Sequence, residues 1–476
     1  MNTELGGTDQ LCPRATISTL PDDVLLNVFC FYSAGNYDAW YTLVHVCQGW
    51  RHVVFASPRR LDLQLFCTNT RPVKTMLDIW PELPLIIYVR FESSRRLGAA
   101  NVIAALKQHD RVYRIFINHI PNSLLKKFAA MKKPFPALKY LDIRSDHHNP
   151  PVLPDSFLGG SAPRLEELTL SNIPSPGLPK LFLSTRDLVF LILEHIPRSG
   201  YRYLSPETIV SCLSMLTKLH EFHLMFRFPR SEAERASRRP PPLSRVIHPT
   251  LTYLWFKGDS DYLEDLVSRI DTPSLDHAHI RFFNQLIFDT PLLGAFISRT
   301  EAFMAPHRAD ISFSGLGVQV ELFRRDQPGK IDDRMLALNV LCRASDWQLS
   351  SIAQICSSTI RSLPTLERLR IYENEFSKPR VQWEGDMEHV QWLELLQPFI
   401  SVNGLVLFLS MVPFVAPAFE ELAKERLTEV LPALRNLFLP EQHPSGAVGE
   451  AIEQFIAARR RSNLPVTIRR PDIGDM

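Results

Sequence analysis

The sequence predicts an α/β fold, a solenoid in which parallel strands alternate with crossover helices, with a small helical module in front of it. Three observations predict this fold. A short Leu-x-x-Leu-x-Leu unit recurs along the chain, amphipathic segments lie between several copies, and two short apolar stretches precede the first copy. The 476 residues include 37 prolines and are 45% hydrophobic. This composition is suited to a large core built from many short elements.

The first helix of the module is expected within LPDDVLLNVFCFY, from Leu20 to Tyr32. Its apolar residues follow an i, i+4, i+8 spacing, and they are Val24, Leu25, Val28, Phe29 and Tyr32. Pro21 is suited to the first helical position, where a missing N–H has no cost. Asp22 and Asp23 are suited to the positive end of the helix dipole. This stretch therefore predicts an amphipathic helix.

A second helix is expected in LVHVCQGWRHVVFAS, where apolar residues recur every three or four positions. They are Leu43, Val46, Cys47, Trp50, Val53 and Val54. Gly35 and Asn36 are the expected helix break between the two stretches. Helices this short have too little core to bury their apolar stripes against each other alone. They need the rest of the chain, or a partner protein.

The repeat unit is the main evidence for the solenoid. Its first apolar positions are Val112, Leu138, Leu165, Leu188, Leu219, Leu251, Leu275, Leu366 and Leu434. Up to Leu275 the copies follow one another by 23 to 32 residues, which matches leucine-rich repeats with some enlarged units. Helical return segments are expected at Ser205–Leu216 and Asp261–Ile270. The prediction is a leucine-rich-repeat-like solenoid with strands on its concave side, irregular beyond Leu275. A conventional α/β sheet is the alternative.

The amino-terminal stretches resemble an F-box, the helical module that docks onto the Skp adaptor of Skp–cullin–F-box ubiquitin ligases. The resemblance rests on Leu20-Pro21, the acidic pair after it, Val24-Leu25, Val28-Phe29 and Cys47-x-x-Trp50-Arg51. It implies that the Skp adaptor and the cullin core are partners. The adaptor would then be bound by Leu20, Pro21, Val24, Leu25, Val28, Phe29, Leu43, Val46, Cys47 and Trp50. An ordinary helical hairpin that caps the next domain is the alternative.

The whole chain resembles the F-box, leucine-rich-repeat-like proteins common in fungi. We expect a flexible tail at 1–14, the F-box at 15–60, and a connecting segment with the first solenoid elements at 61–110. The solenoid would span 111–440 and a carboxy-terminal cap 441–476. The resemblance implies a substrate receptor of a ubiquitin ligase, in which the solenoid binds the target protein. A binding scaffold unrelated to ubiquitin and an unrecognised α/β enzyme are the other two hypotheses.

The expected target site is the concave face of the sheet. In each repeat strand, the residues that alternate with the inward leucines face outward on this side. In the early repeats they are Tyr140, Asp142, Glu167, Thr169, Glu221 and His223. The row continues with Tyr253, Trp255, His277, His279, Arg281, Arg368, Arg370 and Tyr372, which form the predicted binding set. Aromatic residues beside arginines predict a protein-binding site that favours an acidic or phosphorylated peptide. The alternative is an inert face with the target held on loops.

No catalytic, cofactor or metal motif is present, so we expect no enzyme activity and no cofactor. His220 and His223 lie three apart on a strand, on opposite faces, and are not expected to share a metal. The basic loop Arg227–Arg245 is interpreted as a solvated insertion or a docking loop. The net charge of +2 gives no pull toward nucleic acid or membrane, and the apolar run Leu405–Phe419 is short for a membrane span. The scattered cysteines and the lack of a signal peptide predict an intracellular protein with reduced thiols, in cytoplasm or nucleus.

Overall fold

The computed structural model describes most of the chain. The described residues are 20–34, 39–70, 72–91, 97–175, 178–197, 204–230, 244–285, 287–325, 333–360, 363–374, 381, 383, 389–424, 427–439 and 446–470. The expected tail at 1–14, the expected helix break at Gly35 and Asn36, and most of the basic loop lie outside these residues.

After an initial group of three helices, most of the described strands are followed by a helix or a 3-10 turn. The helices are α1 (Asp22–Ser33), α2 (Ala39–Val46), α3 (Gln48–Ala56), α4 (Val73–Ile79), α5 (Leu97–Leu106), α6 (Asn122–Ala129), α7 (Leu178–Phe182), α8 (Pro206–Leu213), α10 (Ser260–Arg269), α11 (Pro291–Arg299), α12 (Ser345–Ser358), α13 (His389–Leu396), α14 (Val412–Lys424) and α15 (Ala447–Arg461). Short 3-10 turns lie at η2 (Phe157–Gly160), η3 (Glu301–Phe303) and η4 (Leu363–Thr365).

In the described part of the chain, sixteen strands form one continuous sheet along the molecule. They are β1 (Leu65–Cys67), β2 (Leu85–Arg90), β3 (Val112–Asn118), β4 (Tyr140–Arg144), β5 (Glu167–Ser171), β6 (Phe190–Ile196), β7 (Glu221–Phe226), β9 (Tyr253–Gly258), β11 (His277–Phe282), β12 (Arg308–Ser314), β13 (Gly317–Phe323), β14 (Arg334–Val340), β15 (Arg368–Glu373), β16 (Gly404–Leu407), β17 (Asn436–Phe438) and β18 (Thr467–Arg469). A separate parallel pair joins β8 (Val246–Ile247) to β10 (Ile270–Asp271).

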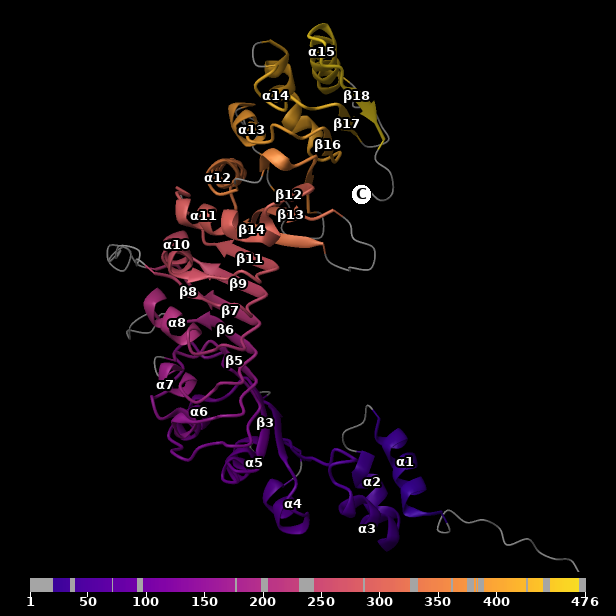
Figure 1. Ribbon diagram of the computed structural model, residues 1–476, viewed down its shortest axis with the longest axis vertical. Helices are drawn as coiled ribbons and strands as arrows, with labels where there is room; N and C mark the ends of the chain where they lie inside the picture. Colours follow the sequence, from indigo (N-terminus) through magenta and orange to yellow (C-terminus); the bar gives the residue numbers. More distant parts are fainter. Residues whose placement is uncertain are drawn as a thin grey trace, which may run out of the picture.

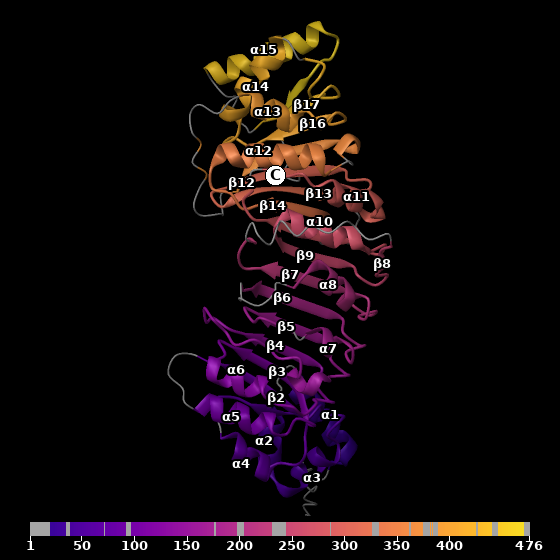
Figure 2. The same cartoon turned by 90° about the vertical axis from the view of Figure 1, so that its left-hand side faces the viewer.

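The sheet curves, with the helices on its outer side and the strands on its inner, concave side (Figures 1 and 2). Each of the nine repeat units predicted from the sequence forms a strand of this sheet. The predicted parallel solenoid is therefore confirmed as a long, mainly parallel sheet with crossover helices. The two predicted return helices are present as α8 and α10.

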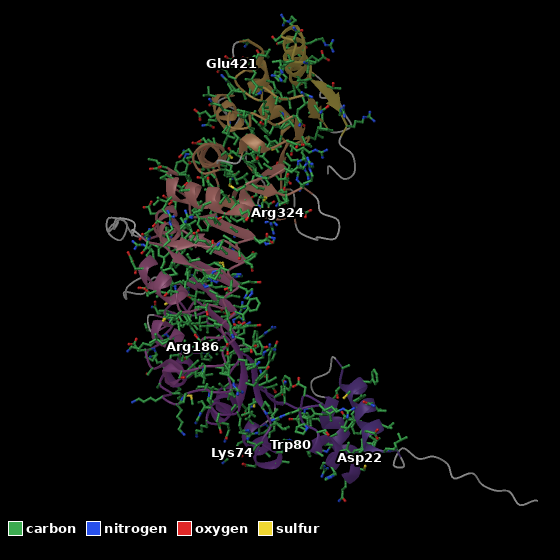
Figure 3. All side chains as sticks on the ribbon, in the orientation of Figure 1. Asp22, Lys74, Trp80, Arg186, Arg324 and Glu421 are labelled. Carbon is green, nitrogen blue, oxygen red and sulfur yellow. The ribbon has the colours of Figure 1, made fainter. Side chains whose placement is uncertain are left out.

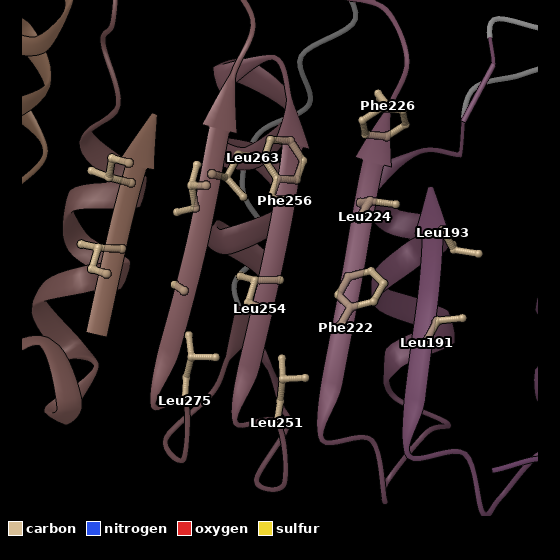
Figure 4. Packing of buried hydrophobic residues seen from close by; sticks show 14 of the residues in the cluster. Leu191, Leu193, Phe222, Leu224, Phe226, Leu251, Leu254, Phe256, Leu263 and Leu275 are labelled. Carbon is tan, nitrogen blue, oxygen red and sulfur yellow. The ribbon is translucent and has the colours of Figure 1, made fainter. Parts of the chain in front are cut away.

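The core lies between the sheet and the outer helices. In β9, buried Leu254 and Phe256 alternate with half-buried residues that face the concave side. Buried apolar side chains of neighbouring strands lie at matching heights (Figure 4), because parallel register pairs Phe222 with Leu254 and Leu224 with Phe256. The alternation places one face of each strand in the core and leaves the other for contacts outside.

The solenoid is interrupted by an antiparallel hairpin in the long gap between repeat units. The strand order there is β11-β14-β13-β12-β15, with β13 antiparallel to both of its neighbours. Because β14 pairs in parallel with β11 and β12 pairs in parallel with β15, the sheet continues through the chain reversal. The tight turn needs Gly317, where a Cβ atom would lie 2.1 Å from the Val340 carbonyl oxygen. The expected irregularity beyond Leu275 is thus a hairpin insertion.

The amino-terminal part is a unit of three helices, and the sequence-based expectation of two helices was wrong. The predicted second helix is broken at Cys47, which has extended backbone angles and ends the run between α2 and α3. Its sulfur accepts a hydrogen bond from the Trp50 N–H at 3.4 Å, which caps α3. Pro21 precedes α1 as its N-cap residue rather than standing inside the first turn.

An aromatic cluster joins this helical unit to the first solenoid elements. Trp80 follows α4 and lies between the two parts (Figure 3). Its ring centroid is 5.5 Å from that of Trp40, 5.4 Å from Tyr41 and 6.0 Å from Phe55. The indole N–H of Trp40 also donates to the Gln64 carbonyl just before β1, at 3.1 Å. The unit is therefore packed against the solenoid and not merely tethered to it.

The apolar run Leu405–Phe419 contributes to β16 and α14. In the described part of the chain, no helix combines the length and hydrophobicity needed to cross a membrane.

Candidate functional site

The first candidate surface is an apolar stripe on the outside of α1. Successive turns expose the side chains of Leu20, Val24, Val28, Phe31 and Tyr32, and Val46 at the end of α2 is exposed as well. Phe31 is 84% exposed and Val28 45% exposed. We call these six residues the α1 stripe. Such a row of uncovered apolar side chains is typical of a protein interface.

The ten predicted adaptor residues differ in their exposure: three are buried, six are exposed and one is half-buried. Leu25, Phe29 and Leu43 are buried inside the three-helix unit, so their predicted role as contact residues is wrong for this conformation. They form the core because positions 25 and 29 lie one turn apart on the inner side of α1. The exposed members are Leu20, Pro21, Val24, Val28, Val46 and Cys47. Trp50 is half-buried and packs on Phe29, with ring centroids 4.8 Å apart.

The second candidate surface is the concave face of β7, β9 and β11. Parallel register aligns Glu221, Tyr253 and His277 in one row across the three strands, and His223, Trp255 and His279 in the next row. The Trp255 ring lies between the two histidine rings, with centroids 5.2 Å from each. The structure therefore brings five of the eight predicted target-binding residues together, namely Tyr253, Trp255, His277, His279 and Arg281.

Both histidines beside Trp255 are held in the neutral form. Burial lowers the pKa of His223 to about 4. Burial, together with the nearby cations of Arg281 and Arg334, lowers the pKa of His279 to about 4 as well. The Nε2 atoms of both rings are buried and have no hydrogen-bond partner among the described residues. The two rings can therefore offer polar nitrogen atoms to a bound group without carrying charge at neutral pH.

These shifts predict an acid-dependent loss of stability. The folded protein takes up a proton on each ring near pH 4, whereas an unfolded histidine does so near 6.5. The two rings therefore leave the free energy of unfolding unchanged above about pH 6.5. They lower it as the pH falls from 6.5 toward 4, because the unfolded chain then binds protons that the folded protein does not. As the pH is lowered from 6.5 to 4, the urea concentration at the midpoint of unfolding should fall less steeply in the double variant His223→Gln, His279→Gln than in the wild-type protein. His220→Gln, at an exposed site, should keep the wild-type slope, and equal slopes in all three proteins would contradict the prediction.

The remaining three predicted residues form a separate group. Arg368, Arg370 and Tyr372 lie on β15, and the hairpin strands β14, β13 and β12 stand between them and β11. Four strand steps of about 4.8 Å place this group about 19 Å from β11. The continuous row expected from the sequence is therefore wrong: it consists of two groups.

The second group is not a simple basic site, because a buried carboxylate lies beside it. Asp310 on β12 is 5% exposed and forms ion pairs with Arg308 at 3.1 Å and Arg370 at 3.7 Å. Burial raises the pKa of Asp310, opposed by the two arginines. Next to it, Glu321 on β13 pairs with Arg334 at 2.7 Å. These carboxylates compete with any anionic ligand for the arginines, which weakens the expectation of an acidic peptide at β15.

Sequence reasoning missed several concave residues. Asp310 and Glu321 lie in the gap where the repeat unit is absent, so no motif marked them. Lys257 was omitted although it continues the alternation of Tyr253 and Trp255 by one more position, and that alternation is the signal that finds it.

Among the predicted outward residues of the early repeats, those of β4 show the expected alternation, whereas β5 and β7 are buried beyond their first residue. Tyr140, Asp142, Glu167 and Glu221 are exposed or half-buried, whereas Thr169 is 8% exposed. A neighbouring pocket adds aromatic residues that the sequence did not indicate: Tyr88 stacks on Phe116 and Arg114 lies over the Tyr140 ring.

Comparisons with known proteins give little further information. No family model matches the chain, and no curated protein matches it. Among solved structures, the chain is similar to the leucine-rich repeat-containing protein LegL7 from Legionella pneumophila, at 13% sequence identity. The match covers 72% of this chain and 97% of that one, with a TM-score of 0.28. A similarity this low carries no argument about function.

Proposed function

We propose that the chain is a substrate receptor of a Skp–cullin–F-box ubiquitin ligase. The α1 stripe binds the Skp adaptor, and the concave face binds the protein to be modified. The observation that carries the proposal is the α1 stripe itself, since it leaves several large apolar side chains uncovered on a small helical unit. Three of its residues, Leu20, Val24 and Val28, stand at positions that resemble the F-box pattern, which supports the adaptor as the occupant.

The receptor acts by holding its target near the ligase and does not itself catalyse ubiquitin transfer. In the described residues, no group of three or more His, Cys, Asp or Glu side chains is arranged to hold a metal. We assign no side chain to a covalent step. Holding a target beside the ligase raises its effective concentration there, and this alone accelerates transfer. Ubiquitin transfer should then depend on the added cullin–RING components.

Adaptor binding is tested with purified Skp adaptor and the full chain. The variant Val24→Glu, Val28→Glu places two charges in the stripe without touching the buried core, since these side chains are 38% and 45% exposed. Interface anchors of this kind each contribute about 2 kcal/mol or more, so affinity should fall at least about 100-fold. Leu183→Glu changes a 66% exposed leucine on the solenoid and should leave affinity unchanged.

Unchanged adaptor affinity in the folded stripe variant would contradict the proposal. If the wild-type chain itself does not bind the adaptor, the second candidate holds, which is a binding scaffold that acts through its concave face alone. That candidate is supported by the grouping of Trp255 with two neutral histidines, which does not depend on the helical unit.

A further inference from the structure

The concave face of β7, β9 and β11 carries opposite charges at the two ends of a diagonal. Glu221 lies at the amino end of β7, in register with Tyr253. Lys257 and Arg281 are in register with each other at the carboxyl ends of β9 and β11. With about 3.3 Å per residue along a strand and about 4.8 Å between strands, the backbone at Glu221 is about 15 Å from that of the cations. Trp255 lies between the two ends.

The cationic end holds two positive charges that have no carboxylate partner among the described residues, and the Lys257 ammonium lies 5.7 Å from the centroid of the Phe283 ring. Lys257 and Arg281 are both half-buried, and neither forms an ion pair with a carboxylate of the described residues. Burial and the nearby Arg281 lower the pKa of Lys257, and burial lowers the pKa of Arg281. The Nε atom of Arg281 and the Nε2 atom of His279 are buried without a hydrogen-bond partner among these residues. An anion bound at this end could accept hydrogen bonds from several of these nitrogen atoms.

The contrast with other arginines of the same face strengthens this point. Arg334 is neutralised by Glu321 at 2.7 Å and Arg144 by Asp142 at 3.0 Å. Buried or half-buried charges in proteins are normally paired, because desolvation without a partner is costly. The pair at positions 257 and 281 departs from this rule, and a ligand that supplies the anion would remove the cost.

The acidic end is formed by Glu221 with Glu167 two strands away. The imidazole of His223 lies beside Glu221, with its Nε2 atom 3.6 Å from the carboxylate. That imidazole is neutral at pH 7 because burial lowers its pKa to about 4. Burial raises the pKa of Glu167; Arg114 opposes this shift, and Glu166 and Glu221 add to it. A cation from a partner would therefore be favoured at this end.

The middle of the diagonal is a platform for an apolar side chain. The Trp255 ring is half-buried and held between His223 and His279. Both neighbours stay uncharged at neutral pH, so an apolar group placed there meets no ionic desolvation cost. Tryptophan fixed by neighbouring rings loses little side-chain entropy on binding, which is typical of interface hot spots.

We propose that this diagonal binds an extended segment of the target protein with a defined charge pattern. The segment places an anionic side chain, carboxylate or phosphate ester, at Lys257 and Arg281, an apolar side chain on Trp255, and a lysine or arginine at Glu221. Its two charged residues are about four or five positions apart, since an extended chain spans about 3.3 Å per residue. The inference rests on the proposed role of the concave face in target binding.

A nucleic acid fits this arrangement poorly. Its phosphates would meet Lys257 and Arg281, but the regular backbone charge would also approach Glu221 and Glu167. A bipolar surface instead selects a ligand that carries both signs at a fixed distance. Complementary charge at two points also fixes the register of the segment on the sheet.

The test uses the full chain and a library of random twelve-residue peptides, followed by synthetic peptides from the enriched pool. We expect enrichment of one acidic and one basic residue about four or five positions apart, with an apolar residue between them. In binding assays, the double variant Lys257→Gln, Arg281→Gln should bind these peptides at least 10-fold more weakly than the wild-type chain. Insertion of four residues between the two charged residues of a peptide should weaken its binding by at least the same factor. Arg186→Gln, at an exposed arginine in the turn before β6 and outside the predicted binding set, should have less than a twofold effect.

Further binding experiments identify the preferred anion and test the two charged ends of the diagonal one at a time. Each synthetic peptide is made with glutamate, phosphoserine or alanine at the acidic position. Weaker binding of the alanine peptide supports the site, whichever of the two anionic peptides binds more tightly. Glu221→Gln should remove the preference for the basic residue and leave the acidic preference in place.

The outcomes distinguish the inference from the proposed function. Peptides that bind through Trp255 but show no charge pair, or are unaffected by Lys257→Gln, Arg281→Gln, would overturn the inference alone. If neither Trp255→Ala nor the charge variants reduce peptide binding or capture of a target from cell extract, the concave face is not the binding site and both fail.

Discussion

Replacing Trp80 with alanine is expected to loosen the helical unit from the solenoid and destabilise the protein by about 3 kcal/mol. The side chain is half-buried, and its ring is surrounded by Trp40, Tyr41 and Phe55, at centroid distances of 5.4 to 6.0 Å. Truncation removes this aromatic packing on both sides of the joint and leaves space that the neighbours cannot fill.

Hydrogen exchange and chemical unfolding measure the effect. Amides of α2 and α3 should exchange faster in Trp80→Ala, whereas those of β5 and β6 should be unchanged. Ile79→Ala is the matched control, because this neighbouring side chain is 66% exposed and packs little. A loss below about 1 kcal/mol, the range of ordinary surface changes, would show that the two parts are held together by other contacts.

Removing the carboxylate of Asp310 is expected to have a similarly large effect. Asp310→Ala removes a carboxylate that is 5% exposed and forms ion pairs with the guanidinium groups of Arg308 and Arg370. Breaking a buried ion pair from one side costs about 3 to 5 kcal/mol, because the remaining charge stays desolvated. The unfolding free energy should fall by an amount in this range.

A second variant tests the cause of that loss. Asp310→Leu combined with Arg308→Met removes the carboxylate together with its closer partner, at 3.1 Å, and should recover part of the lost stability, since apolar groups of similar size replace a buried pair at little cost. Glu394→Ala, at an exposed carboxylate of α13, should change stability by less than about 0.5 kcal/mol. If the double variant is no more stable than Asp310→Ala, lost packing and not unpaired charge is responsible.

The repeat strands were predictable because their signal is local. The first apolar residue of each repeat unit is buried whichever strands lie beside that unit, and this holds from Val112 to Leu434. The alternation of outward residues followed from the same geometry, so Tyr253 and Trp255 were placed correctly.

What was missed depends on contacts between segments far apart in the chain. Spacing by threes and fours continues through Cys47, and only the cap on the Trp50 N–H reveals that α2 ends there. Apolar runs in β12, β13 and β14 do not indicate strand direction. The separation of Arg281 from Arg370 was therefore invisible in the sequence, as were the carboxylates that lie between them.

The hairpin insertion also bears on the order in which the chain folds. Most neighbouring strands pair residues close in sequence: Leu168 pairs with Leu191, 23 positions later. At the insertion, Ala278 pairs with Leu336, 58 positions later, and Arg308 pairs with Arg368, 60 positions later. Closing longer loops costs more entropy and slows the search for native pairing. The repeats up to β11 and those from β15 onward can each nucleate and propagate locally, and the two halves then join when the hairpin forms between them.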